Sequence, residues 1–351
     1  MTASFPDTDG VRSVAPGRLS WDTEGIAESI EAAVEAVRQS RGVVVTTHER
    51  PDGDAIGSAL AAAAVVRALG VPVWVVTADP VPDVLSFLPE SDLVSRTLPS
   101  EPFDVTIVVD CSERHRVGAF PERGWADTSI CLDHHATHDP AMATIIARDP
   151  SAPASAELVY RFACVAGVQL TPSMATQLFC ALQTDTGSFR YDSTTARALE
   201  LGSRLLETNI SVWPISSAIY ESNPPERLAL MGRVLPELTY RHEGAVAFLP
   251  VRAADLAASG ATSEMADGLI KLARSVRGVE VAVQLTEEPG YWRVNLRSRG
   301  VVAVGPVAER FGGGGHINAA GCRVSGSLEE AMKALSDAFA PLLAGSDGSA
   351  T

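Results

Sequence analysis

The sequence lacks several features that define whole classes of protein. No apolar run approaches the roughly 20 residues that a membrane-spanning helix needs, and the first ten residues contain neither a basic start nor an apolar stretch. The five cysteines form no C-x-x-C pair, which argues against a disulfide framework and against a cysteine zinc site. We therefore expect a cytoplasmic protein with no membrane partner, whose cysteines serve as small buried hydrophobic residues.

Basic residues are also scarce. The chain has 28 Lys and Arg against 43 Asp and Glu, for a formal net charge of -15. A protein that tracks long nucleic acid needs a basic surface that releases counterions, so we expect no long nucleic acid tract as a partner. Most of the acidic excess is interpreted as a solvated surface, and part of it fits carboxylates that bind metal ions.

Length and hydrophobic patterning predict two domains. The 351 residues, of which 46% are hydrophobic, can bury more than one core. The first half alternates short apolar runs with helical patterns, which predicts an α/β domain with a parallel sheet and helices on both faces. The expected strands are 43–47, 71–77, 105–109 and 129–132, and the expected helices are 55–69, 156–165, 173–182 and 195–206.

The pattern loosens after residue 206, and a smaller α/β domain with a mixed sheet is expected from residue 238. Its predicted strands are 245–251, 279–286, 291–298 and 321–324, and its predicted helices are 264–274, 304–311 and 328–343. The predicted organisation is therefore a disordered N-terminus (1–20), a first domain (21–206), a linker (207–237), a second domain (238–345) and a disordered tail (346–351).

Acidic and imidazole side chains follow the predicted strands of the first domain. His48 and Asp110 each come directly after a strand, and the run 133–135, which reads Asp-His-His, comes directly after the next one. Ligands of open parallel sheets bind at the carboxyl ends of the strands. We therefore expect these side chains to meet at one edge of the sheet.

Further carboxylates join this edge. Asp52 and Asp54 stand two residues apart in the turn after the first strand, where Pro51 and Gly53 fix the bend. Asp185 lies just beyond a predicted helix, where a turn-forming role fits the sequence equally well. So many carboxylates and imidazoles in one crevice repel one another unless cations lie between them, which predicts a pair of divalent ions. Mixed imidazole and carboxylate ligands suit manganese, iron or cobalt better than magnesium or calcium.

Five ordered motifs together resemble a known family. In chain order they are THERPDGDAIGSALA, VVDCSE, LDHHAT, LQTDTGSFRY and GGGGHINAAG. Over residues 43–324 the sequence resembles the DHH phosphoesterases with their DHH-associated C-terminal domain. It is most similar to the bacterial branch of nanoRNA oligoribonucleases, which also includes 3'-phosphoadenosine 5'-phosphate phosphatases and phosphodiesterases of cyclic di-AMP or pApA.

The resemblance implies that the first domain is the catalytic domain, and it implies a role for each of the matching residues there. Two divalent ions would activate a water that attacks phosphorus in line. Mn2+ is the expected ion, and Mg2+ and Co2+ are the alternatives. The implied ligands of one ion are His48, Asp52 and Asp110, and those of the other are Asp54, Asp110, His134 and Asp185. Asp110 would bridge the ions, Asp133 would orient a histidine and His135 would face the scissile phosphate, so these three are the implied catalytic residues.

The resemblance also implies that the second domain recognises the substrate and closes over the metal ions. The glycine run would let backbone N–H groups approach a phosphate, to which His316 and Arg297 donate. A flexible linker is the alternative interpretation of this run. The implied substrate-binding residues are Arg190, Arg297, Ser298, Gly313, Gly314, Gly315 and His316. The sequence departs from the family at His138, Met142 and Asp192, which leaves the substrate contacts of those loops open.

The resemblance implies a metal-dependent phosphodiesterase and phosphatase, and it also implies a homodimer. Its expected substrates are short oligoribonucleotides, 3'-phosphoadenosine 5'-phosphate, or cyclic di-AMP and pApA. An inorganic pyrophosphatase or polyphosphatase of the same superfamily is the alternative enzyme, and the GGGGH motif favours nucleotides over it. A non-catalytic nucleotide-sensing module is the alternative from another class, and the complete ligand set argues against it.

Overall fold

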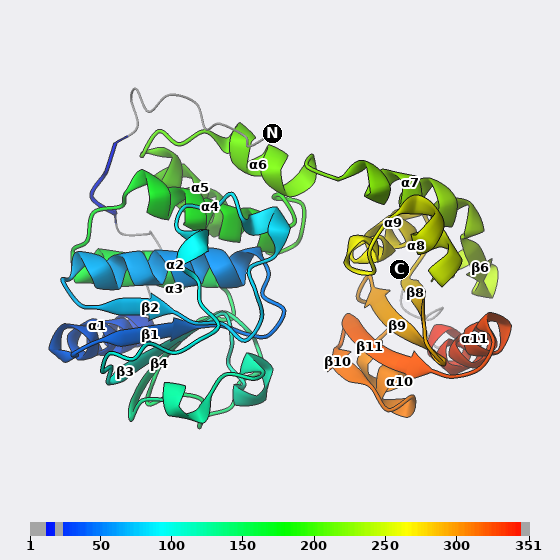
Figure 1. Cartoon of the computed structure of the whole chain (residues 1–351), viewed down its shortest axis with the longest axis horizontal. Helices are drawn as coiled ribbons and strands as arrows, with labels where there is room; N and C mark the ends of the chain where they lie inside the picture. The colour runs from blue at the N-terminus through cyan, green and yellow to red at the C-terminus, as the bar shows by residue number, and fades with distance from the viewer. Residues whose placement is uncertain (1–11, 18–23, 345–351) are drawn as a thin grey trace. The chain divides into compact units, whose positions relative to one another are not determined.

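Figure 1 shows the chain as a computed structural model, which describes residues 12–17 and 24–344. These residues form two compact units that divide between Ser222 and Asn223. The division falls inside the range 207–237, which holds two helices, α6 (Val212–Tyr220) in the first unit and α7 (Pro225–Val234) in the second. Among the described helices, none combines the length and apolar character needed to span a membrane.

The first unit is built on a sheet of five parallel strands in the order β2-β1-β3-β4-β5, so the predicted parallel sheet with helices is confirmed. Its strands are β1 (Val43–Thr46), β2 (Val73–Val75), β3 (Val105–Val109), β4 (Thr128–Asp133) and β5 (Ile145–Arg148). Its helices before α6 are α1 (Glu24–Gln39), α2 (Gly53–Ala68), α3 (Ser155–Ala166), α4 (Pro172–Asp185) and α5 (Ala196–Leu206). The sequence patterns had not indicated α1 or the half-buried edge strand β5.

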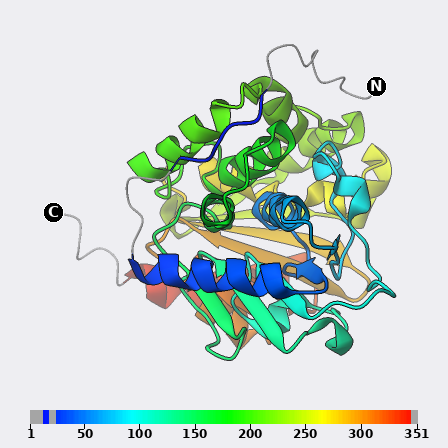
Figure 2. The ribbon, with the colours of Figure 1, turned by 90° about the vertical axis from the view of Figure 1, so that its left-hand side faces the viewer.

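Both faces of this sheet are covered, as the burial of consecutive strand residues requires. Val45 packs beneath the α-helices, and Figure 1 shows α2 to α5 stacked on that side of the strands. Figure 2 shows α1 running crosswise to α2, which is seen end-on. Val44 packs on the other face, beneath loops and two 3-10 helices, η3 (Arg114–Val117) and η4 (Glu122–Gly124). The helices on that second face are short 3-10 helices.

Residues 12–17 pack on the first unit, although the sequence predicts disorder for 1–20. Val14 forms a β-bridge with the loop between α3 and α4, and the hydroxyl of Tyr160 donates to the last carbonyl of the segment at 2.9 Å. The other residues of the predicted disordered N-terminus, and the predicted tail 346–351, lie outside the described residues.

The second unit is built on a mixed sheet in the order β10-β11-β9-β8-β7-β6, as the sequence predicts. The pair β7–β8 is parallel and the other pairs are antiparallel. The strands are β6 (Thr239–Arg241), β7 (Val246–Val251), β8 (Val281–Glu288), β9 (Tyr291–Ser298), β10 (Gly314–His316) and β11 (Ala319–Val324). The helices after α7 are α8 (Ala253–Ser259), α9 (Ile270–Ser275), α10 (Gly305–Arg310) and α11 (Leu328–Ala344).

Helices also cover both faces of this second sheet. Ala247 of β7 packs with α7 and α9, whereas the next residue, Phe248, packs with α10 and α11. Strand β9 continues the alternation: Val294 is buried beneath α10 and α11, while Arg293 and Arg297 are half-buried on the opposite face. Polar side chains of β9 therefore collect on one face of the sheet.

Candidate metal centre

The carboxyl ends of three neighbouring strands supply side chains to one edge of the first unit. Strand β1 pairs with β3, and β3 pairs with β4, all in parallel. His48 lies two residues after β1, Asp110 lies directly after β3, and Asp133 is the last residue of β4. Asp110 has a left-handed backbone with φ 55°, which is uncommon outside glycine and clusters at functional turns.

The first group of side chains consists of His48, Asp52 and Asp110. Nε2 of His48 lies 3.4 Å from Oδ2 of Asp110 and 3.9 Å from Oδ1 of Asp52. Nδ1 of His48 lies 2.8 Å from the carbonyl oxygen of Glu49, and donation there leaves the lone pair of the neutral ring on Nε2. Asp52 also caps α2, because its Oδ1 accepts two N–H groups of the first turn at 3.1 Å each.

The second group consists of Asp54, His134 and Asp185. Nε2 of His134 lies 3.8 Å from Oδ2 of Asp54, 3.6 Å from Oδ2 of Asp185 and 3.5 Å from Oδ1 of Asp110. Asp110 therefore turns one carboxylate oxygen toward His48 and the other toward His134. This shared carboxylate joins the two groups.

A close helix contact brings Asp185 to the cluster. Asp185 ends α4, and Thr184 of that helix lies against Gly53 of α2. A Cβ at Gly53 would lie 2.4 Å from Oγ1 of Thr184, so only glycine permits this approach. The turn after Asp185 holds Ser188 and Phe189 in the left-handed region, a further strained segment beside the site.

The donor set fits divalent cations. Three groups offer one ligand atom per residue within 4.8 Å of one another: Asp110 with His134 and His135, His48 with Asp52 and Asp110, and Asp54 with His134 and Asp185. Mixed imidazole and carboxylate donors of this kind suit transition metals. The structure thus brings together all six residues that the resemblance implied as ligands, and these residues could hold metal ions.

The crowded environment of this cluster raises the pKa values of three of its groups, Asp54, Asp185 and His134. Burial and the charge of Asp110 raise the pKa of Asp54 well above its ordinary range. Burial, together with nearby carboxylates, also raises the pKa of Asp185 to about 6. For His134, burial favours the neutral ring, but the carboxylates of Asp54 and Asp110 outweigh it and raise the pKa to about 9. The cluster therefore holds protons that a divalent cation can replace.

Asp133 and His135 adjoin the cluster, and Nδ1 of His135 lies 3.6 Å from Oδ1 of Asp110. Asp133 is fully buried, and its Oδ1 lies 2.8 Å from Nδ1 of His135. The backbone N–H of His135 and the hydroxyl of Ser112 donate to Oδ2 of Asp133. Although His135 lies near Asp110 and His134, this bond directs its Nδ1 toward Asp133 and leaves the lone pair of the neutral ring on Nε2. Asp133 thus contacts His135, and the role that the resemblance implied for it, to orient a histidine, stays a prediction.

Two serines of this site were missed by the sequence reasoning. Ser112 bonds Asp133, and Ser155 at the start of α3 bonds Asp54 and Asp110. Ser112 belongs to the motif VVDCSE, which was a usable signal, whereas Ser155 lies in a stretch without any motif.

Arg190 lies on the surface next to the cluster. It follows the turn after Asp185, and its Nε donates to the carbonyl of Gly187 at 2.6 Å. This bond fixes the arginine on the same turn that carries Asp185. Its predicted contact with substrate stays a prediction.

The two predicted substrate-binding residues of β9, Arg297 and Ser298, differ in how deeply they are buried. Arg297 is half-buried, its Nη1 donates to the carbonyl of Leu296 at 2.9 Å, and burial together with the charge of Arg274 lowers its pKa. Ser298 is only 2% exposed, and its Oγ accepts the N–H of Gly300 at 2.9 Å. Because the alternation of β9 turns Ser298 into the core, its side chain is not placed to contact a ligand.

The glycine run begins in a turn and continues as a strand, so it is not a linker in the structure. Gly314–His316 form strand β10, which pairs with β11. A Cβ at Gly313 would lie 2.1 Å from the carbonyl oxygen of Gly321, so close backbone packing requires glycine there. The N–H of Gly313 donates to the carbonyl of Ala308 at 2.9 Å and serves the end of α10 rather than a phosphate. Gly315 has φ 143°, a conformation that likewise favours glycine; the side chain of His316 lies outside the described part.

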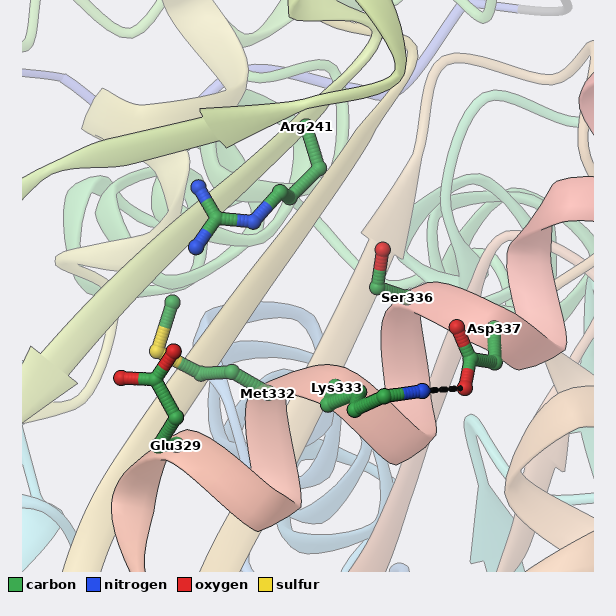
Figure 3. Close-up of a pocket in the computed structure, with 6 residues that line it drawn as sticks. All are labelled: Arg241, Glu329, Met332, Lys333, Ser336 and Asp337. Carbon is green, nitrogen blue, oxygen red and sulfur yellow. Dashed lines mark hydrogen bonds and ion pairs between the residues drawn. The ribbon is translucent and has the colours of Figure 1, made fainter.

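A hollow of about 250 Å³ on the second unit contains none of the predicted site residues (Figure 3). It is lined by residues of β6 and α11, namely Arg241, Glu329, Met332, Lys333, Ser336 and Asp337. Lys333 and Asp337 already form an ion pair at 2.6 Å. The hollow therefore does not extend the candidate site.

Comparison with known proteins finds family models and relatives that match this chain. The model of the DHH family, N-terminal domain, matches residues 42–182, and the model of the DHHA1 domain matches residues 244–342. The bifunctional oligoribonuclease and PAP phosphatase NrnA of Thermus thermophilus is 32% identical over 92% of this chain and 95% of that protein. NrnA of Bacillus subtilis is 25% identical over 84% of this chain and 93% of that protein.

A solved structure has the same fold. An exopolyphosphatase-related protein from Bacteroides fragilis superposes with a TM-score of 0.83 at 24% identity, over 90% of this chain and 98% of that chain. Fold, site and relatives together define a hydrolase of phosphate esters. The chain belongs to the DHH family, with a DHHA1 domain as its second unit, and the resemblance of the five motifs is confirmed.

Proposed function

We propose that the chain is a two-metal phosphodiesterase and phosphatase for small nucleotides. Its proposed substrates are short oligoribonucleotides, 3'-phosphoadenosine 5'-phosphate, and cyclic di-AMP with its linear product pApA. The observation that carries the proposal is the convergence of two ligand groups on Asp110, whose two oxygens face different histidines. Bridged metal pairs of this kind serve hydrolytic enzymes that act on phosphate esters.

The six clustered residues are the proposed metal ligands. His48, Asp52 and Asp110 would hold one ion, and Asp54, Asp110, His134 and Asp185 would hold the other. When bound, such a pair supplies an activated water and neutralises charge on the phosphoryl oxygens. Mn2+ is the proposed ion because it accepts mixed imidazole and carboxylate ligands, with Mg2+ or Co2+ as alternatives.

His135 and Asp133 take a different role in this proposal. Asp133 holds the ring of His135 through Nδ1, so the Nε2 edge of the ring is proposed to meet the scissile phosphate. A positioned histidine can give a proton to, or accept one from, the reacting oxygens. The buried hydroxyl of Ser112 keeps Asp133 in the orientation that this contact needs.

Short nucleotides are the proposed substrates for two reasons. Two relatives, from Thermus thermophilus and Bacillus subtilis, are named as bifunctional oligoribonucleases and PAP phosphatases. The net charge of -15 disfavours long nucleic acid, which would need a basic track. Arg190 and Arg297 are the proposed anchors for substrate phosphates. We also propose that the protein is a cytoplasmic homodimer, and the mass of the particle in solution tests the dimer.

One assay tests the proposed substrates together. Purified protein with Mn2+ is offered pApA, cyclic di-AMP, a five-nucleotide RNA, 3'-phosphoadenosine 5'-phosphate and pyrophosphate, and the products are separated by chromatography. We expect mononucleotides from the nucleotide substrates and little phosphate from pyrophosphate. Preferential hydrolysis of pyrophosphate would instead identify the alternative enzyme.

Matched variants connect the activity to the cluster. His134→Ala and Asp133→Ala should each reduce hydrolysis at least about 10²-fold, because one removes a ligand and the other releases His135. His115→Ala is the control, since that histidine is exposed on η3 and joins none of the three groups. Unchanged hydrolysis by His134→Ala and Asp133→Ala would rule out the proposed mechanism.

A further inference from the structure

One residue outside every sequence motif contacts the carboxylates of the cluster. Ser155 is the first residue of α3 and is fully buried. Its backbone N–H donates to Oδ2 of Asp54 at 2.6 Å, and its hydroxyl donates to Oδ1 of Asp110 at 2.9 Å. Because an ionised carboxylate only accepts hydrogen bonds, the serine hydroxyl is the donor in the second contact.

Asp54 is held mainly by the backbone at this point. Its Oδ1 accepts the N–H of Ala156 at 3.1 Å and the hydroxyl of Ser58 at 2.8 Å, in addition to the amide of Ser155 on Oδ2. The first amides of a helix favour a negative charge. The start of α3 therefore fixes Asp54 even when the side chain at 155 is changed.

Asp110 depends on the side chain of Ser155 in a different way. Its Oδ1 lies 2.9 Å from that hydroxyl, closer than the 3.5 Å to Nε2 of His134, while Oδ2 faces His48 at 3.4 Å. A hydrogen bond to one oxygen sets the rotation of the carboxylate, and this rotation decides which group each oxygen faces. Without the hydroxyl, the buried carboxylate keeps its imidazole neighbours but loses this close donor.

We propose that Ser155 is a positioning residue of the metal centre, whose hydroxyl holds the shared carboxylate of Asp110 in the orientation that serves both ligand groups. The inference rests on the proposed two-metal function. Partners of metal-ligating carboxylates typically contribute about 10- to 100-fold in metal affinity or activity.

The test measures metal binding directly. Chelator-treated full-length protein is titrated with Mn2+ by calorimetry, and electron paramagnetic resonance counts the free and bound ions. Ser155→Ala should weaken Mn2+ binding by about 10- to 100-fold and lower kcat by a similar factor. Ser155→Thr keeps the hydroxyl and should restore most of the affinity.

Ser129→Ala is the matched control. Ser129 is a buried serine of β4 whose Oγ accepts the N–H of Thr144 at 3.1 Å. Ser129→Ala therefore also removes a buried, hydrogen-bonded hydroxyl, but one that contacts no residue of the cluster. Thermal unfolding of all variants in chelator separates folding from metal binding, and Ser155→Cys offers a variant of similar size if Ser155→Ala is unstable. Wild-type affinity in Ser155→Ala, or equal losses in Ser155→Ala and Ser129→Ala, would overturn the positioning role alone. A wild-type protein that binds no Mn2+ would overturn both this role and the proposed function.

Discussion

The candidate metal centre of the first unit and the hairpin of β10 and β11 in the second unit, called the glycine hairpin, differ in how their residues are packed. In the cluster, three ionisable side chains are buried: His48 is 7% exposed, Asp54 1% and Asp110 3%. In the hairpin, glycines let two backbone segments approach closely. Arg297 of the neighbouring strand β9 is half-buried. Buried charges must be compensated where they are, whereas a backbone contact has to fit only sterically. Substitutions in the cluster should therefore act on chemistry, and those near the hairpin on substrate affinity or folding.

The largest effect is expected from Asp110→Asn. The substitution keeps the shape of the side chain but removes the negative charge that both ligand groups share, so kcat should fall about 10³-fold or more. Asp83→Asn, an exposed aspartate at the start of a 3-10 helix of the same unit, should leave kcat unchanged. Steady-state kinetics at saturating Mn2+ measures both. A fall of less than tenfold for Asp110→Asn would mean that the shared carboxylate is not central.

A smaller effect of another kind is expected from Arg297→Ala. A charged hydrogen bond to phosphate contributes about 1.5–3 kcal/mol, so KM for pApA should rise about 10- to 100-fold while kcat changes little. Arg241→Ala removes an exposed arginine of β6 in the same unit and serves as the control. If kcat fell for Arg297→Ala and KM stayed constant, the contrast between the two regions would be wrong.

The pH dependence of metal binding tests the buried cluster alone. Burial lowers the pKa of His134, but carboxylates raise it to about 9, above the ordinary 6.5. In the metal-free protein this group contributes stability that is present below pH 6.5 and is lost as the pH rises through 9. An incoming ion must displace this proton, so Mn2+ affinity should increase up to about tenfold per pH unit across the same window. Calorimetry in buffers with different ionisation enthalpies measures the released proton, and pH-independent binding without proton release would contradict the prediction.

The smallest effect is expected from a pair of glycine substitutions in the hairpin. Gly313→Ala would bring a Cβ to 2.1 Å from the carbonyl oxygen of Gly321, and such overpacking costs about 1–3 kcal/mol of unfolding free energy. Gly314→Ala meets no atom within 4 Å and should stay within about 0.5 kcal/mol of wild type. Denaturant unfolding of both variants gives the comparison. Equal stabilities would show that the hairpin tolerates a side chain at either position.

Much of the fold could be predicted because runs of hydrophobic residues indicate which segments are buried strands and helices. Strands β3 and β9 occupy the residues expected of them, 105–109 and 291–298. The short edge strand β5 was missed because four residues, three of them half-buried, carry little periodicity. Strand β10 was missed because glycines lower strand propensity, and its formation depends on close contacts with β11 that the local sequence does not express.

The candidate site divides in the same way. The sequence alone determined that Asp and His side chains follow the ends of parallel strands. The alternation of strand and helix patterns predicts a parallel sheet, in which the carboxyl ends of the strands lie at one edge. Only the tertiary structure decided which of them meet: the left-handed turn at Asp110, the contact of Gly53 with Thr184, and the bonds from Ser155. These contacts join residues far apart in the chain, and long-range packing of this kind leaves no signal in local composition.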